Sequence, residues 1–193
     1  DVLDDPLAAV PAREIEVGYS RVLTLRVTYL GELGYELYVP SDQAVSVWET
    51  LEAAGGDLGL KPVGLGALNG LRLEKGYRDY GLDIDVTDTP VSAGLSFAVA
   101  WDKPVAFHGK AALEALRHDR SSRLVNVLLH DPEPLLHGSE PVLKGGQRVG
   151  PLQVGGFGHT VGASVGLATV DHADGVSAEW LASGGFEVVV NGT

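Results

Sequence analysis

The stretch Pro62–Ile84, PVGLGALNGLRLEKGYRDYGLDI, places an arginine on the apolar side of a predicted helix. Proline at the first helical position and glycine near the end are the expected boundaries of such a helix. Leu65, Leu68 and Leu71 recur at helical spacing, so this side is expected to face a core. Arg72 shares that side, and an inward guanidinium needs a carboxylate, a phosphate or a planar polar ligand. The segment alone leaves a structural salt bridge and a binding site equally open.

Upstream of this helix, the sequence predicts a β-hairpin and a second helix. Residues 21–30 alternate as in a half-buried strand, and YELYVP (35–40) resumes the pattern after a Gly-flanked break. The apolar face of the first strand is expected to carry Leu23, Leu25, Val27 and Tyr29. An apolar stripe from Ala44 to Leu51 then indicates a helix that ends at a glycine pair.

Downstream, residues 94–101 predict a strand and residues 109–118 a short helix. From Arg123 the residue pattern changes to short apolar runs separated by turn residues. This spacing is typical of a small sandwich or barrel. These runs are RLVNVLLH, EPVLKGG, QRVGPLQV, ASVGLATV, SAEWLA and FEVVV. We therefore expect an α+β chain with two domains, residues 1–117 and a C-terminal β-barrel over residues 118–193.

The composition narrows the classes of function. The chain has 193 residues, a formal net charge of −12 and no cysteine. An acidic balance argues against nucleic acid and against an anionic membrane surface as partners. No apolar run approaches the ~20 residues of a membrane helix, and a cytoplasmic location fits the lack of cysteine. The six histidines lack metal-ligand spacing, so no metal site is expected.

Two glycine clusters, at 64–70 and 156–162, do not match a dinucleotide-binding fingerprint. Each reads G-x-G-x-x-x-G, one residue too long, and neither stands between a strand and a helix. The sequence also lacks the G-x-S-x-G turn of a serine hydrolase. The sequence therefore does not favour nucleotide-dependent redox chemistry or acyl transfer.

Glu32 is the most suggestive acid in the chain. It lies in GELGYE, where the flanking glycines let the backbone approach a ligand closely. A carboxylate can accept two parallel hydrogen bonds from a planar, amidine-like ring edge such as a 2-aminopyrimidinone. A solvent-exposed turn residue, or a partner for Arg72, explains the same pattern.

Taken together and in order, several segments resemble the later part of the folate-binding domain of the glycine-cleavage T-protein (aminomethyltransferase) family. These segments are RVTYLGELGYELYVP, GLGALNGLRLEKGYRDYGLDI, DTPVSAGLSFAV and FHGKAAL. The C-terminal run VGGFGHTVGASVGLATV is similar to the T-protein-like domain of sarcosine and dimethylglycine dehydrogenases, although Gly155 stands where that branch would have serine.

The resemblance implies a tetrahydrofolate cofactor and a small amine-derived one-carbon donor, with 5,10-methylenetetrahydrofolate as product. It implies Glu32 as the pterin-binding carboxylate, and Arg72 and Tyr80 as further folate-site residues. Tyr29 and Tyr35 are weaker candidates for the pocket walls. Glu32 and Arg72 are expected to converge on one cleft.

The resemblance also implies that part of the catalytic unit lies elsewhere. The family's active-site aspartate belongs to the first half of the folate domain, which no segment here matches, so no catalytic residue is assigned and the activity of the chain alone stays open. We expect a missing N-terminal half or a partner chain, and FAD only in such a missing N-terminal region if the protein is of the dehydrogenase type.

Two other readings remain. One is a non-catalytic folate-binding or regulatory module of the same fold. The other is a β-rich interaction domain without a ligand, which an unpaired, solvent-exposed Arg72 would favour.

Overall fold

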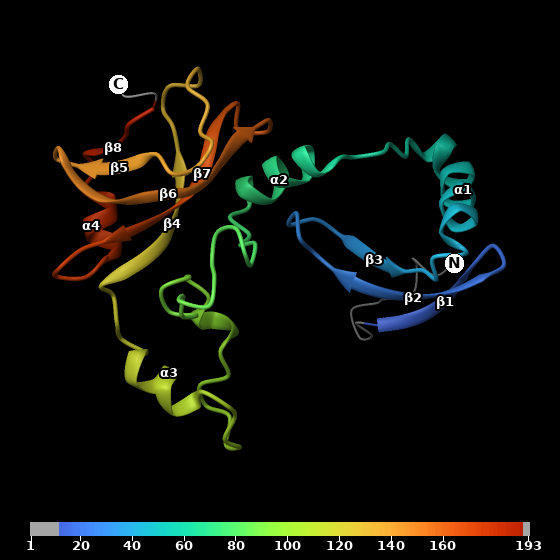
Figure 1. The fold of residues 1–193 in the computed structure, drawn as a ribbon, viewed down its shortest axis with the longest axis horizontal. Coiled ribbons are helices and arrows are strands. Elements are labelled where there is room, and N and C mark those ends of the chain that lie inside the picture. Colours follow the sequence, from blue (N-terminus) through green and yellow to red (C-terminus); the bar gives the residue numbers. More distant parts are fainter. Residues whose placement is uncertain (1–11, 191–193) are drawn as a thin grey trace. The chain divides into compact units, whose positions relative to one another are not determined.

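The computed structural model describes residues 12–190 of the chain (Figure 1). The chain divides into two compact units, Asp1–Leu68 and Asn69–Thr193. Each unit is described by itself below. This division concerns packing; the expected domain boundary between residues 117 and 118 stays a prediction.

The first unit is a three-stranded antiparallel sheet with one helix. The strands β1 (Ala12–Val17), β2 (Ser20–Val27) and β3 (Gly34–Tyr38) lie in the order β1-β2-β3. Helix α1 (Ala44–Gly55) follows and continues into a 3-10 turn, η1 (Gly56–Leu58). The β2–β3 pair confirms the predicted hairpin, and α1 ends at the predicted glycine pair.

The face of β2 that α1 covers is the opposite of the predicted one. Val22 is fully buried and clusters with Val17 and Val47, whereas Leu23 is 41% exposed. Side chains alternate across a strand, so Leu23 and Leu25 lie on the face that α1 leaves open. The alternation in the sequence located the strand correctly, but both faces carry apolar residues and the pattern could not say which one the helix covers.

Helix α2 (Leu65–Glu74) was predicted, yet its buried side is shifted by one residue. Leu65 is 82% exposed, while Arg72 and Leu73 are buried. Helix α2 approaches the backbone at Phe157 closely through Gly70, because a Cβ on Gly70 would lie 3.1 Å from the carbonyl oxygen of Phe157. The arginine, and not the leucine stripe, therefore belongs to the packed side.

The segment after α2 runs through turns, a 3-10 turn η2 (Ser96–Ala98) and helix α3 (Lys110–Leu116). The strand predicted over residues 94–101 is absent. The chain curls there on local hydrogen bonds, from Leu95 N to Pro90 O and from Trp101 Nε1 to Ser96 O. The hydrogen bonds within these turns, and not the apolar content of the stretch, therefore determine its conformation.

The C-terminal part of the second unit is a five-stranded antiparallel sheet in the order β4-β7-β6-β5-β8. Its strands are β4 (Ser122–Leu128), β5 (Pro141–Lys144), β6 (Gln147–Gly158), β7 (Ala163–Asp171) and β8 (Phe186–Val188). An apolar core that includes Leu136, Val142, Leu152, Ala168 and Val170 lies on one side. These strands confirm the predicted β-rich C-terminal part.

One predicted strand in this region is a helix. The run SAEWLA contains α4 (Ala178–Ala182), which begins after Ser177. The Ser177 hydroxyl accepts a hydrogen bond from Trp180 N at 3.0 Å and so caps the N-terminus of this helix. No described helix is long and apolar enough to cross a membrane.

Candidate functional site

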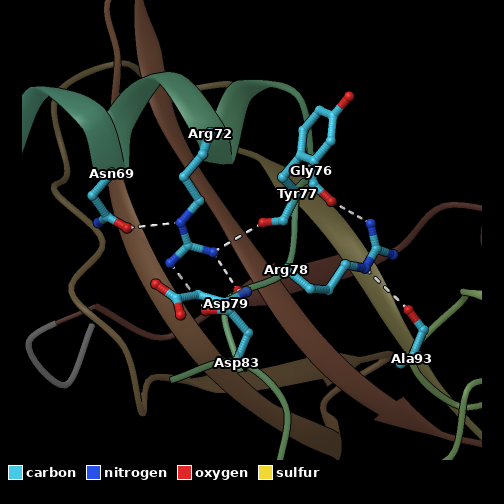
Figure 2. A network of polar contacts seen from close by, with 8 residues as sticks. All are labelled: Asn69, Arg72, Gly76, Tyr77, Arg78, Asp79, Asp83 and Ala93. Carbon is cyan, nitrogen blue, oxygen red and sulfur yellow. Dashed lines mark hydrogen bonds and ion pairs between the residues drawn. The ribbon is translucent and has the colours of Figure 1, made fainter. Parts of the chain in front are cut away.

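The guanidinium of Arg72 lies at the centre of a closed polar network (Figure 2). Arg72 is 0% exposed and forms a two-pronged ion pair with Asp83, with 3.1 Å between Nη2 and Oδ1. Its Nε donates to Asn69 Oδ1 at 2.9 Å, and Nη1 also donates to the Tyr77 carbonyl at 3.0 Å. The described chain thus supplies the carboxylate that a buried arginine needs.

The network fixes the turn that follows α2. Asp83 Oδ2 also accepts from the backbone amide of Asp79 at 2.8 Å, so one carboxylate joins the Arg72 guanidinium to the loop at Asp79 and Asp83. The sequence analysis did not identify Asp83 as the partner of Arg72. The need of an inward arginine for an acid was recognised, but the turn that brings Asp83 to Arg72 was not predicted.

Arg78 extends the same arrangement to the next turn. Its Nε donates to the Ala93 carbonyl at 3.0 Å, and its Nη1 contacts the carbonyl of Gly76 (Figure 2). Burial lowers the pKa of Arg78 from its usual value, while the nearby Asp83 charge opposes that shift. Arg78 therefore holds the loop over residues 77–94 by carbonyl contacts.

Glu74 ties the end of α2 to the β6–β7 turn. Its Oε1 accepts from the amides of Thr160 at 2.6 Å and Val161 at 3.2 Å. Burial alone would raise the pKa of Glu74, but the hydrogen bonds from Thr160 and Val161 outweigh it and lower the pKa below 4.5. Together, Arg72 and Glu74 make the end of α2 a rigid polar junction.

The open face of the first unit carries a different kind of acid. Glu36 lies opposite Leu25 in the β2–β3 register and shares its face with Leu23 and Tyr38. Leu23 is 41% exposed and Tyr38 is 53% exposed. The Tyr38 hydroxyl donates to Glu36 Oε2 at 2.9 Å, and this hydrogen bond raises the pKa of Tyr38 above 10.0. A carboxylate thus lies among exposed apolar and aromatic side chains.

Three of the predicted site residues belong to the β2–β3 hairpin. Glu32 is exposed in the bend between the strands, and Tyr29 is half-buried in the same bend. Tyr35 is opposite Arg26 in register, so it lies on the α1 side of the sheet, away from Glu36. Sequence reasoning missed Glu36, although the second acid of GELGYE was a signal for it.

The other two predicted residues lie in the second unit. Tyr80 is 67% exposed and forms an isolated bridge with Ile84 inside the loop that Arg72 fixes. Because Glu32 and Arg72 belong to different units, their convergence on one cleft stays a prediction. An exposed, unpaired Arg72 would favour a ligand-free interaction domain. The structure shows the opposite, because Arg72 is buried and paired with Asp83. Among residues 12–190, no group of three or more His, Cys, Asp or Glu side chains could hold a metal ion.

Comparisons with known proteins find two family models in order along the chain. The GCVT N-terminal domain matches residues 1–103, and the glycine cleavage T-protein C-terminal barrel domain matches residues 122–193.

Relatives and a solved structure agree with these matches. The chain is 43% identical over 196 residues to 4-methylaminobutanoate oxidase (formaldehyde-forming) of Paenarthrobacter nicotinovorans, covering 100% of this chain and 23% of that protein. It is 42% identical over 151 residues to an aminomethyltransferase of Halothermothrix orenii, covering 78% of this chain and 42% of that protein. The crystal structure of the glycine cleavage system aminomethyltransferase T of Bartonella henselae superposes with a TM-score of 0.74 at 30% identity, covering 89% of this chain and 46% of that one.

The chain spans less than half the length of each of these relatives. One family model alone matches more than half of the chain, and the sheet-and-helix part is followed by the β-rich C-terminal part as expected. The chain therefore belongs to the glycine cleavage T-protein family.

Proposed function

We propose that this chain is the tetrahydrofolate-binding portion of a one-carbon transfer enzyme. The enzyme would be an aminomethyltransferase, or an oxidase or dehydrogenase that forms 5,10-methylenetetrahydrofolate from an amine-derived donor. The observation that carries the proposal is the ordered match of both T-protein family models along one chain. The two kinds of relative, an aminomethyltransferase and a 4-methylaminobutanoate oxidase, support this choice of reactions.

The open face of the β1-β2-β3 sheet fits a flat pteridine. Leu23, Leu25 and Tyr38 offer an apolar and aromatic surface of the kind that lines small-molecule sites. Glu36 supplies an acceptor that can receive two parallel hydrogen bonds from the 2-amino-pyrimidinone edge of the ring. We therefore propose Glu36 beside Glu32 as a pterin-binding carboxylate, with Glu36 on the sheet and Glu32 in the bend.

Arg72 and Tyr80 take different roles in this proposal. The donors of Arg72 are engaged by Asp83, Asn69 and the Tyr77 carbonyl, so Arg72 acts as a positioning residue. It holds the loop that presents the exposed Tyr80. Tyr29 remains a weaker candidate for the pocket walls, whereas Tyr35 lies on the α1 side of the sheet and does not line this face.

Tetrahydrofolate, when bound, supplies the N5 and N10 nitrogens that accept the one-carbon unit. The residues of this chain bind and orient it, and the proton transfer falls to an acid outside the segments assigned here. FAD would belong to another region of an oxidase-type protein. We propose a cytoplasmic location, and folate and the donor amine as the partners.

Isothermal titration of tetrahydrofolate into the purified protein tests the site. Glu36→Gln removes a charged acceptor, and hydrogen bonds to charged groups contribute about 1.5–3 kcal/mol. We expect Kd to rise at least about tenfold and a smaller rise for Glu32→Gln. Glu49→Gln, an exposed acid on α1, is the matched control and should leave Kd unchanged.

Unchanged affinity in both the Glu32 and Glu36 variants would remove the site assignment. A turnover assay on this chain alone separates the catalytic from the non-catalytic reading. We expect folate binding without aminomethyltransferase turnover from the isolated chain. Robust turnover would show that a catalytic residue lies within it. Binding that persists with no turnover even in the full-length protein would favour a regulatory module.

A further inference from the structure

Tyr38 and Glu36 form a hydrogen-bonded pair on the open face of the first unit. They are two residues apart on β3, so both side chains lie on that face, opposite Leu23 and Leu25 of β2. The Tyr38 hydroxyl donates to Glu36 Oε2 at 2.9 Å. Both side chains are exposed. A ligand that lies on Leu23 and Leu25 therefore meets a carboxylate whose conformation Tyr38 helps to set.

The open face carries two further acids, and both lie beside a cation. Glu14 forms an ion pair with Arg21, and Glu16 is directly opposite Arg21 in the β1–β2 register. Arg21 is the one basic residue that β1, β2 and β3 place on this face. Glu36, in contrast, has a neutral phenol as its hydrogen-bond partner. The charge of Glu36 is therefore left for a ligand, whereas Arg21 balances negative charge on the β1 side.

The phenol of Tyr38 keeps its proton near neutral pH. The hydrogen bond to Glu36 and the negative charge of Glu36 raise the pKa of Tyr38 above its usual value. The hydroxyl is therefore available as a donor, and its hydrogen bond restrains a glutamate side chain that otherwise has large rotamer freedom. Restraint before binding reduces the entropy that is lost when a ligand binds, which is the advantage of a pre-organised site.

The remaining acceptor sites of Glu36 match a pair of adjacent N–H donors. A carboxylate has about four acceptor sites, and Tyr38 occupies one of them on Oε2. At least one site on each oxygen is left for two parallel hydrogen bonds from a planar donor pair. A 2-amino-4-oxo pteridine presents such a pair, at its 2-amino group and at N3. A ring that lacks one of these donors leaves one carboxylate oxygen unpaired, which weakens binding.

We propose that Tyr38 is a positioning residue that holds the Glu36 carboxylate with both oxygens toward the ligand, and so makes the open face selective for pteridines with adjacent 2-amino and N3 donors. This inference rests on the proposed folate function and extends it to the recognition of one edge of the ring. The hydroxyl of Tyr38 acts through Glu36, while its ring forms part of the apolar surface. The two roles separate in Tyr38→Phe, which removes the hydroxyl and keeps the ring.

Isothermal titration with two ligands tests the role of the hydroxyl. The ligands are tetrahydrofolate and its 2-desamino-2-methyl analogue, in which a methyl group replaces one donor group. We expect Tyr38→Phe to raise Kd for tetrahydrofolate about threefold to tenfold, and Kd for the analogue less than about twofold. Tyr19→Phe, at a fully exposed tyrosine between β1 and β2, is the matched control and should change neither Kd.

A double-mutant cycle assigns the effect to the Tyr38–Glu36 pair. Glu36→Ala removes the acceptor, so adding Tyr38→Phe to it should change Kd for tetrahydrofolate less than about twofold. A partly unfolded variant would raise the apparent Kd of both ligands by the same factor. The ratio of the two Kd values therefore distinguishes the positioning role from a loss of stability.

The outcomes separate this inference from the proposed function. Unchanged Kd for tetrahydrofolate in Glu36→Ala would overturn both the pterin site on the open face and the role of Tyr38. Weaker binding in Glu36→Ala, together with equal changes for the two ligands or no change in Tyr38→Phe, would overturn the role of Tyr38 alone and leave the folate site in place.

Discussion

The two units of the chain use their charged side chains in opposite ways. In the second unit, Arg72 and Asp83 are 0% and 4% exposed and pair with each other. In the first unit, Glu36 stands on an open face beside Leu23, which is 41% exposed. A charge whose partners are all internal stabilises one backbone arrangement, whereas a carboxylate on an uncovered apolar face has its acceptors available to a ligand. In the proposed function, this difference separates residues that position the site from residues that contact its ligand.

The sharpest way to break this comparison is to remove the acid from the buried pair. Asp83→Asn leaves the Arg72 guanidinium without its counter-charge, and breaking a buried pair in this way costs about 3–5 kcal/mol. Urea denaturation monitored by circular dichroism measures the free energy of unfolding. Glu14→Gln, which breaks an exposed ion pair with Arg21 in the first unit, should cost less than about 1 kcal/mol.

A double variant sharpens the same point. Arg72→Met with Asp83→Leu removes both charges and should recover much of the stability lost by Asp83→Asn. Equal costs for Asp83→Asn and Glu14→Gln would show that the Arg72 network does not stabilise the second unit.

The glycines extend the comparison to packing. A Cβ on Gly155 would lie 2.4 Å from the carbonyl carbon of Leu136, whereas a Cβ on Gly66 would meet nothing within 4 Å. Gly155→Ala should therefore destabilise by about 1–3 kcal/mol. Gly66→Ala should stabilise by up to about 1 kcal/mol, because alanine favours the helix. Thermal unfolding reports both, and a neutral Gly155→Ala would contradict the packing seen at β6.

The smallest effect concerns the Glu74 junction and depends on pH. Hydrogen bonds from Thr160 and Val161 lower the pKa of Glu74 below 4.5 despite the opposing effect of burial. A carboxyl with a lowered folded-state pKa contributes stability above its unfolded pKa, and this is lost as pH falls through the folded value. Glu74→Gln should thus destabilise by less than about 1 kcal/mol at pH 7. The gap to the unmodified protein should shrink as pH falls below 4.5.

Urea titrations of both proteins at neutral and acidic pH measure that gap. A gap that stays constant or widens on acidification would show that the charge of Glu74 does not hold the β6–β7 turn.

The sequence predicted the elements better than their surroundings. The hairpin, α1 and most of the C-terminal strands followed from alternation, periodicity and glycine positions. The strand predictions for residues 94–101 and for SAEWLA were wrong, because short apolar runs do not distinguish strands from turns or short helices. In SAEWLA, the capping by Ser177 decided the outcome.

The candidate site was predictable only in part. The inward position of Arg72 was visible in the sequence, but its pairing with Asp83 depends on the turn over residues 77–83. Glu36 was missed because its accessibility to a ligand depends on which face of β2 and β3 the helix covers. That choice is a packing outcome, and alternation alone gives both faces the same pattern.

The most direct test of the account is an amide chemical-shift titration with tetrahydrofolate. If the open face of the first unit binds the pteridine, the largest shift changes fall on residues around Leu23, Leu25, Glu36 and Tyr38 and are lost in Glu36→Gln. Shift changes that avoid this face, or that persist unaltered in Glu36→Gln, would contradict the account.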